Sequence, residues 1–457
     1  MSLKSINPAT GELLAEYDEH GEAEVGRRLE RSARAFRDWR ETSFPERSER
    51  LARAAVVLRE RRREWAELMT REMGKPIAGA EAEVEKCAWA CEHFAEKAER
   101  FLAPEEIATD ASRSGVRYDP LGPVLAVMPW NFPFWQVFRF AAPAVMAGNV
   151  ALLKHAGNVS GSALAIEEIF REAGFPDGVF TTLLVPSERV AELIGHEAIR
   201  AVTLTGSVGA GRAVAAEAGR HLKKTVLELG GSDPFLVLGD ADPAKTAARA
   251  AEARTLNSGE SCIAAKRFLP VAAVAPAFEE ELVRRMEGLA VGDPMDPGTQ
   301  VGPLAREDLL EELHDQVERT VAAGATLRTG GRRIDPLGDG RGFFYAPTVL
   351  TGVEPGMAAF DEETFGPVAA VTRARDAEHA LELANRSRFG LGASVWTGDA
   401  VAGLELAGRI EAGNVFVNAI VKSDPRLPFG GVKESGYGRE LSAFGIREFV
   451  NVKTVWV

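Results

Sequence analysis

Cysteine is scarce in this 457-residue sequence, and its three copies are too few for a disulfide framework. Long apolar runs are absent as well. The most apolar stretch, residues 141–153, is interrupted by proline, glycine and asparagine and is too short to span a membrane. The first residues contain no apolar segment typical of a signal peptide. Together these absences predict a cytoplasmic protein with no membrane contact.

Basic charge is also in short supply, because 54 lysines and arginines stand against 67 aspartates and glutamates, for a net charge of −13. A nucleic-acid surface would need a basic stripe, so we expect no nucleic-acid partner. The seven histidines lack the spacing of a metal site or of a Cys-His hydrolase, and no metal is expected. The composition is typical of a soluble globular protein, and the length predicts roughly two to three domains.

The order of apolar segments predicts an α/β fold. A helical pattern covers residues 45–73, where a Gly-Lys-Pro sequence ends it, and a second covers residues 78–101. From residue 150 to 257 short apolar strands alternate with helices, which predicts a mostly parallel sheet covered on both faces. Ligands of such sheets lie beyond the carboxyl ends of the strands. The valine-rich tail, residues 449–457, predicts a strand that pairs with another sheet or subunit.

The three cysteines are of two kinds. Cys87 and Cys91 lie on the apolar stripe of the second helix, which favours a structural role; a metal pair would need a third ligand, and the nearby sequence offers none. Cys262 follows a Gly-containing turn and has small neighbours, so a substrate could reach its sulfur. The positive charge of Lys266 would favour the thiolate, which is the nucleophilic form. A buried, inert cysteine is the alternative.

Two polar side chains that follow apolar strands could take part in chemistry. Asn131 lies in the run Pro-Trp-Asn-Phe-Pro, where its amide could stabilise an oxyanion or, alternatively, cap a helix. Glu228 precedes two glycines at the end of another strand and could activate a water molecule as a general base.

Two further strand ends are typical of nucleotide-binding sites. Gly206 and Ser207 lie in a glycine-rich turn between a strand and a helix, where backbone N–H groups can hold a pyrophosphate. This turn is not a Walker A motif, because Lys-Ser or Lys-Thr does not follow it. Lys154 ends a buried strand and could meet a ribose hydroxyl or a phosphate, with a solvated lysine as the alternative.

Taken in order, these segments resemble the aldehyde dehydrogenase superfamily over essentially the whole chain. Each motif is modest, but the ordered set is highly specific. The motifs are the Pro-Trp-Asn-Phe-Pro run, Thr205-Gly206-Ser207, Glu228-Leu229-Gly230-Gly231, Gly259-x-x-Cys262, Glu362-Glu363-Thr364-Phe365-Gly366-Pro367 and Pro428-Phe429-Gly430-Gly431-Val432-Lys433. One departure is Glu260, where the family usually has glutamine; the turn around it is kept, so we expect the change to be tolerated.

The resemblance implies an aldehyde dehydrogenase-like architecture: a Rossmann-type cofactor domain, an α/β catalytic domain and a β oligomerisation element. The expected cofactor-binding domain comprises residues 1–108 and 122–231, and the catalytic domain comprises residues 232–442. A hairpin at residues 109–121 and the tail, residues 443–457, would form the oligomerisation element of a homodimer or homotetramer.

The same resemblance implies roles for individual residues. Cys262 would add to a small-molecule aldehyde, and Asn131 with the Cys262 backbone N–H would hold the oxyanion. Hydride transfer to a nicotinamide would leave a thioester, and Glu228 would activate the water that releases the acid. The expected cofactor-binding residues are Trp130, Lys154, Gly206, Ser207, Gly211, Leu229, Glu363 and Phe365.

Cofactor preference is predicted from a single position. Relatives that prefer NAD often have a glutamate three residues after the strand-end lysine, and here that position is Gly157. No carboxylate there repels a 2′-phosphate, and Lys154 could attract one. We therefore expect NADP to be accepted and preferred over NAD.

Within the superfamily the likeness is strongest to bacterial succinate-semialdehyde dehydrogenases, which predicts succinate semialdehyde as the substrate. Arg139 lies eight residues after Asn131, where such enzymes place an arginine on the far carboxylate of the substrate. A structural arginine paired on a helix is the alternative. Ser423 is a second expected substrate contact. Some relatives have another arginine six residues before the cysteine, but Leu256 stands there in this chain.

Three alternatives differ in their chemistry. A broad-specificity aldehyde dehydrogenase would use other aliphatic or carboxylated aldehydes. A CoA-acylating enzyme would transfer the acyl group to CoA, and the presence of Glu228 argues against it. The complete set of Asn131, Glu228 and Cys262 argues against a non-catalytic binding protein with the same fold.

Overall fold

The computed structural model describes residues 2–338 and 340–457. The first large sheet has the strand order β21-β9-β8-β5-β6-β7. Its strands are β5 (Pro123–Met128), β6 (Val150–His155), β7 (Phe180–Thr182), β8 (Ala201–Thr205), β9 (Lys224–Glu228) and β21 (Gly436–Tyr437). The strands from β5 to β9 run parallel, whereas β21 pairs with β9 in the antiparallel direction. A segment from near the C-terminus thus forms one edge of the sheet.

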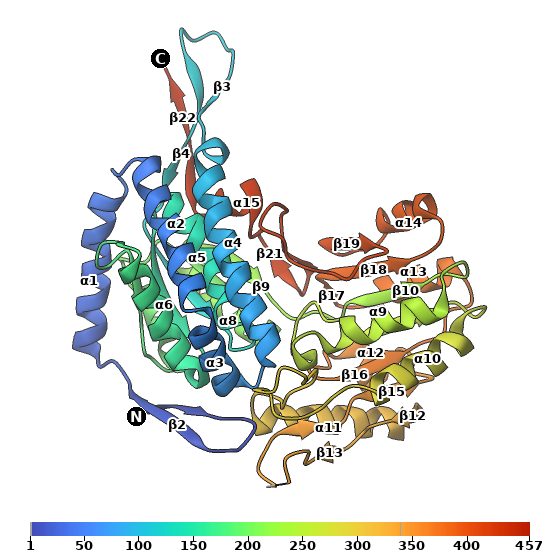
Figure 1. Ribbon diagram of the computed structural model, residues 1–457. Coiled ribbons are helices and arrows are strands. Elements are labelled where there is room, and N and C mark those ends of the chain that lie inside the picture. Colours follow the sequence, from blue (N-terminus) through green and yellow to red (C-terminus); the bar gives the residue numbers. More distant parts are fainter. Residues whose placement is uncertain (1, 339) are drawn as a thin grey trace.

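Helices cover both faces of this sheet, as the alternation of strands and helices predicted (Figure 1). They are α1 (Glu22–Trp39), α2 (Phe44–Glu60), α3 (Arg62–Met73), α4 (Ile77–Phe101), α5 (Trp135–Met146), α6 (Ser160–Glu172), α7 (Val190–Gly195) and α8 (Val208–Arg220). Leu125 of β5 packs with α1, α7 and α8, whereas Val124 and Ala126 pack with α2 to α6 on the other face. Because successive strand residues point to opposite faces, a strand buried on both sides has an uninterrupted apolar sequence.

The segment predicted as one helix over residues 45–73 is two helices, α2 and α3. The backbone turns at Arg61, whose φ of −110° and ψ of 24° are not helical. Both helices keep an apolar side against α4, so the apolar spacing continues across the break and does not reveal it. The predicted end of the segment is confirmed, because Gly74 takes the left-handed conformation with a φ of 80°.

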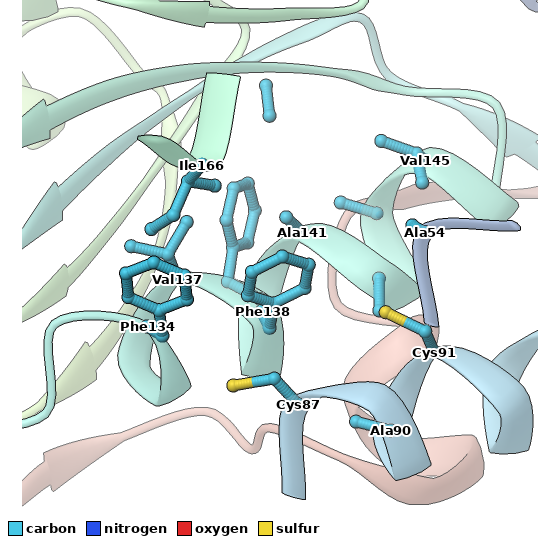
Figure 2. Packing of buried hydrophobic residues seen from close by; sticks show 14 of the residues in the cluster. Ala54, Cys87, Ala90, Cys91, Phe134, Val137, Phe138, Ala141, Val145 and Ile166 are labelled. Atoms are coloured by element: carbon cyan, nitrogen blue, oxygen red, sulfur yellow. The ribbon is translucent and has the colours of Figure 1, made fainter. Parts of the chain in front are cut away.

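Cys87 and Cys91 are fully buried on α4, which confirms their structural interpretation. Figure 2 shows their sulfurs among apolar side chains that include Phe134, Phe138 and Ala141. Burial raises the pKa of both thiols. They are therefore neutral and act as small hydrophobic groups in the helical layer.

A second large sheet has the strand order β12-β15-β16-β11-β10-β18-β19. Its strands are β10 (Pro234–Val237), β11 (Arg267–Pro270), β12 (Thr326–Thr329), β15 (Thr348–Thr351), β16 (Val368–Val371), β18 (Gly392–Trp396) and β19 (Asn414–Val417). Neighbouring strands are parallel, except that β12 is antiparallel to β15. Its core is shared with α9 (Pro243–Thr255), α10 (Ala275–Glu287), α11 (Glu307–Ala322), α12 (Ala358–Asp361), α13 (Ala377–Asn385) and α14 (Ala400–Ala407).

Short pairings join other segments of the chain. They are β1 (Ser2–Ile6) with β2 (Leu13–Asp18), β13 (Arg333–Ile334) with β14 (Phe344–Tyr345), and β17 (Phe389–Gly390) with β20 (Val432–Lys433). Within the described residues, no helix is both long enough and apolar enough to cross a membrane.

The predicted C-terminal strand is present and has its pairing partner within the chain. After α15 (Ser442–Ile446), β22 (Val450–Trp456) pairs antiparallel with β4 (Ser114–Pro120), which also pairs with β3 (Glu105–Glu106). This small sheet projects away from the two large ones (Figure 1). The strand therefore needs no second subunit for its first hydrogen-bonded neighbour, because β4 supplies it.

Candidate active site

The predicted site residues follow the carboxyl ends of adjacent parallel strands. Asn131 follows β5, and Lys154 lies at the end of β6. Ser207 follows β8, and Glu228 ends β9. In a parallel sheet the carboxyl ends of the strands lie along the same side of the sheet, called the sheet edge below, and ligands bind there. The fold thus brings together polar groups that are far apart in the sequence.

The loop that carries Cys262 begins with consecutive residues in the left-handed conformation. Asn257, Ser258 and Gly259 have φ values of 54°, 57° and 83°. Such a conformation costs a residue other than glycine about 1–3 kcal/mol and persists where the surrounding structure enforces it. At Gly259 there is no room for a side chain, because an added Cβ would lie 2.3 Å from backbone atoms of Gly366. The loop is therefore held in a turn that the rest of the fold stabilises.

Lys266 anchors the backbone of this loop. Its fully buried ammonium donates hydrogen bonds to the carbonyl oxygens of Ser261 and Cys262, both at 2.9 Å, and of Ala264 at 3.1 Å. The carboxylate of Glu363 lies 3.5 Å from the same ammonium. Lys266 therefore sets the position of the cysteine through the main chain.

Asn131 contacts the cysteine loop directly. Its Nδ2 donates to the carbonyl oxygen of Glu260 at 3.1 Å, and Asn257 Nδ2 donates to the carbonyl oxygen of Asn131 at 2.8 Å. A side-chain amide has two N–H groups, so a second donor of Asn131 remains for an oxyanion near Cys262.

Glu260, which stands where the family usually has glutamine, is completely buried. It accepts a hydrogen bond from Ala305 N–H at 3.0 Å. Burial raises the pKa of its carboxyl well above the usual value, which favours the neutral acid. A neutral carboxylic acid has nearly the shape of a glutamine amide, and this explains why the substitution fits the turn.

Cys262 differs from the two core cysteines in being partly exposed. Burial of the sulfur raises the pKa of its thiol to about 12, although the charges of Arg139 and Lys266 oppose this rise. The predicted effect of Lys266 on the thiolate therefore has the right direction, but burial outweighs it. At neutral pH the sulfur needs a proton acceptor before it can act as a nucleophile.

Glu228 lies next to a second buried carboxyl group. In the described part of the chain, neither of its carboxylate oxygens has a hydrogen-bond partner. Burial, and then the charge of Glu440, raises the pKa of Glu228 well above the usual value. A raised pKa makes the carboxylate form a stronger base, and when ionised its free lone pairs can accept a proton from water.

Arg139 is engaged by protein groups in this structure. Its side chain is buried and forms an ion pair with Glu440. It also donates to Thr205 Oγ1 at 3.3 Å and lies over the ring of Phe429. These contacts favour the alternative interpretation of a paired structural arginine, and its role in substrate binding stays a prediction.

Ser423, the other predicted substrate contact, lies beside a lysine that the sequence analysis did not single out. Its Oγ accepts hydrogen bonds from Lys86 Nζ at 2.8 Å and from Trp135 Nε1 at 3.1 Å. Lys86 and Glu440 gave no sequence signal, because a charge on an amphipathic helix or in a loop normally faces solvent. Lys86 and Ser423 are 337 residues apart, so only folding brings them together.

The turn after β8 has the form expected for a pyrophosphate site. Ser207 caps α8, and its Oγ accepts a hydrogen bond from Ala210 N–H at 3.3 Å. Leu229 packs closely on Gly211, where an added Cβ would lie 2.5 Å from the leucine side chain. Because Gly211 has no side chain, α8 can approach the end of β9. The N-terminus of α8 then lies at the carboxyl ends of the strands.

Two further predicted cofactor residues flank that edge. Lys154 Nζ donates to Ser187 Oγ at 3.1 Å. The ring of Trp130 packs edge-on against Phe365, with ring centroids 5.8 Å apart. A helix N-terminus, a cation at a strand end and two aromatic rings at one sheet edge are groups that suit a dinucleotide.

Comparison with known proteins agrees with this arrangement. The profile described as the aldehyde dehydrogenase family matches residues 1–455. The chain belongs to the aldehyde dehydrogenase family. Membership confirms the predicted resemblance, the α/β fold and the class of enzyme, an NAD(P)-dependent aldehyde dehydrogenase.

Relatives of this aldehyde dehydrogenase match it over nearly their full lengths. It is 52% identical over 457 residues, all of both chains, to a probable succinate-semialdehyde dehydrogenase (NADP+) of Synechocystis sp.. It is 50% identical to the succinate semialdehyde dehydrogenase Sad (NAD(P)+) of Escherichia coli, over 99% of this chain and 97% of that one. A succinic semialdehyde dehydrogenase of Streptococcus pyogenes, solved with NADP+, is 36% identical with a TM-score of 0.97, over 100% of this chain and 99% of the other.

Proposed function

We propose that this aldehyde dehydrogenase oxidises succinate semialdehyde to succinate with NADP+. The observation that carries the proposal is the contact between Asn131 and the strained loop that presents Cys262, beside a sheet edge suited to a dinucleotide. The choice of aldehyde is supported by relatives with this named activity at 52% and 50% identity.

The residues have complementary roles in this reaction. The thiol of Cys262 first loses its proton to solvent. Its sulfur then adds to the aldehyde carbon, and Asn131 Nδ2 donates a hydrogen bond to the oxyanion that forms. When bound, NADP+ supplies the acceptor for the hydride, and the sulfur adduct becomes a thioester. Glu228 then takes a proton from a water molecule while the oxygen of that water attacks the thioester carbon. The C–S bond breaks, succinate leaves, and the sulfur of Cys262 is free again.

The proposed cofactor contacts follow the ends of the strands. Ser207 and the N-terminus of α8 would hold the pyrophosphate. Lys154 would face the adenosine ribose and its 2′-phosphate, because its ammonium, near the end of β6, donates to Ser187 Oγ at the same side of the sheet. Glu363 and Phe365 would contact the nicotinamide ribose and ring.

Replacing Gly157 by glutamate is expected to reverse the cofactor preference. The new carboxylate would lie three residues from Lys154, repel a 2′-phosphate and accept a hydrogen bond from a 2′-hydroxyl. We expect the ratio of kcat/KM for NADP+ to that for NAD+ to fall at least about tenfold, equivalent to about 1.4 kcal/mol. Initial rates with each cofactor at saturating aldehyde measure this ratio.

Gly157→Gln is the matched control, because it adds the same bulk without the charge. An added Cβ at this position would lie 3.2 Å from the Leu3 side chain, so both variants displace the same neighbour. If the glutamine variant shifts the ratio as far as the glutamate variant, repulsion of the phosphate is not the cause, and the assignment of this position is wrong.

The unmodified enzyme is expected to prefer a carboxylated aldehyde. With NADP+, kcat/KM for succinate semialdehyde should exceed that for butanal at least about tenfold, since a charge-assisted contact to the carboxylate adds binding energy. Turnover should not need CoA. Equal kcat/KM values for the two aldehydes would support a broad-specificity enzyme, and strict dependence on CoA would support the acylating alternative.

We propose that the small sheet of β3, β4 and β22 forms a contact between subunits of a homodimer or homotetramer. The support is its exposed apolar surface, since Val452, Val455 and Trp456 are 60%, 40% and 55% exposed. The molar mass in solution, measured by light scattering, distinguishes a dimer from a tetramer.

A reducing compartment such as the cytoplasm would suit an enzyme whose nucleophile is a free cysteine.

A further inference from the structure

We propose that Lys86 binds the far carboxylate of the substrate and so sets the specificity of the enzyme for a carboxylated aldehyde. This inference rests on the proposed function and names a residue for it. Lys86 lies on α4, outside the motifs of the sequence analysis, and its ammonium is positioned by two groups. It donates to Ser423 Oγ at 2.8 Å and lies 4.2 Å from the centroid of the Trp135 ring.

The first argument is an imbalance of charge. Among residues 2–338 and 340–457, no carboxylate forms an ion pair with Lys86, although the lysine is partly buried. The nearby carboxylates are already neutralised, because Glu83 pairs with Lys75 and Asp424 pairs with Arg426. Burial lowers the pKa of Lys86 to about 8, so the ammonium remains mostly charged at neutral pH. A cation withdrawn from water without a counterion is stabilised when an anion arrives.

The second argument is the free hydrogen-bonding capacity around this cation. An ammonium has three N–H donors, and in the described residues one of those of Lys86 has an acceptor, Ser423. The Ser423 oxygen accepts from both Lys86 and Trp135, so its own O–H is free to donate. A carboxylate with two oxygens suits these donors better than a neutral group, because charge-assisted hydrogen bonds are the stronger ones.

The third argument is position. Trp135 is the first residue of α5 and lies four residues after Asn131, which precedes the helix. A four-carbon aldehyde whose carbonyl oxygen is held by Asn131 would therefore extend its carboxylate toward the start of α5, where Trp135 contacts Lys86. Arg139 is one turn further on, but its charge is already matched by Glu440. Some relatives have a second arginine where this chain has Leu256. Lys86 therefore supplies the positive charge that is missing at that position.

The test uses the full-length enzyme with Lys86→Met, which keeps a side chain of similar length and removes the charge. We expect the KM for succinate semialdehyde to rise at least about tenfold more than the KM for butanal. Lys86→Arg should restore most of the difference, because it returns the charge. Lys97→Met, at a partly exposed position of the same helix, should leave the ratio of the two KM values unchanged. Melting temperatures report whether each variant is folded.

A second measurement separates this proposal from the proposed function. Succinate should inhibit butanal oxidation by the unmodified enzyme, and Lys86→Met should weaken that inhibition at least about tenfold. If the folded variant shows equal changes in both KM values and unchanged inhibition by succinate, Lys86 does not bind the carboxylate. If the unmodified enzyme instead prefers butanal while Lys86→Met still weakens inhibition by succinate, the proposed substrate is wrong and the carboxylate site stands.

Discussion

Replacing Cys262 by alanine is expected to lower kcat/KM for aldehyde oxidation by at least about 10³-fold, because no other group can form the covalent adduct. In the proposed reaction this sulfur is the nucleophile. Asn131 and Lys266 both donate hydrogen bonds to main-chain carbonyl oxygens of its loop, those of Glu260 and Cys262 respectively. Initial rates of absorbance increase at the nicotinamide band measure the loss. Titration with a thiol reagent should show that a partly exposed thiol has disappeared.

Cys91→Ala is the matched control for this substitution. It also removes one thiol, but from the core of the helical layer, where the sulfur is fully buried and has no part in the proposed reaction. We expect it to reduce stability modestly and to keep kcat/KM within about threefold of the parent. If the Cys262 variant oxidised aldehydes as fast as the parent, a mechanism through this cysteine would be excluded.

Replacing Glu228 by glutamine is expected to separate the two halves of the reaction. The side chain keeps its size but can no longer take a proton from water, so release of the acid should slow by about 10²–10⁴-fold. Hydride transfer precedes that step and should remain. A rapid-mixing experiment should therefore show a burst of up to one reduced cofactor per subunit, followed by very slow turnover.

Glu252→Gln, a change of the same kind at an exposed position of α9, is the control and should leave both phases intact. Two outcomes would contradict the role of Glu228. Full steady turnover would show that another group activates the water. Loss of the burst together with turnover would show that Glu228 acts before the thioester forms, for example as the acceptor for the thiol proton.

The raised pKa of Glu228 and the ion pair of its neighbour are parts of one electrostatic arrangement. Burial, and then the charge of Glu440, raises the pKa of Glu228, while the charge of Arg139 opposes the rise. Burial also raises the pKa of Glu440, and its ion pair with Arg139 opposes that rise. Because Arg139 stabilises this pair, a change in its kinetics need not report on substrate binding, and Lys86 is the cleaner place to test recognition of the carboxylate.

Much of the fold could be predicted from the sequence because its signals are local. The alternation of apolar strands and helices between residues 150 and 257 follows from burial on both faces of a parallel sheet. The break at Arg61 was missed, since two helices packed on the same neighbour keep a continuous apolar spacing. The partner of the terminal strand came only from the family resemblance, which grouped the tail with the hairpin at residues 109–121: pairing with β4 joins residues more than 300 positions apart, and no local pattern encodes it.

The sequence by itself determined the family, the choice of Cys262 as the proposed nucleophile and the strand ends that carry Asn131, Lys154, Ser207 and Glu228, because each lies within a motif whose chemistry depends on its immediate neighbours. Tertiary structure alone decided which charges meet. It paired Arg139 with Glu440 and left Lys86 beside Ser423 without a carboxylate among the described residues. The physical reason is that electrostatic energy depends on distance and burial in three dimensions, and neither quantity is set by spacing along the chain.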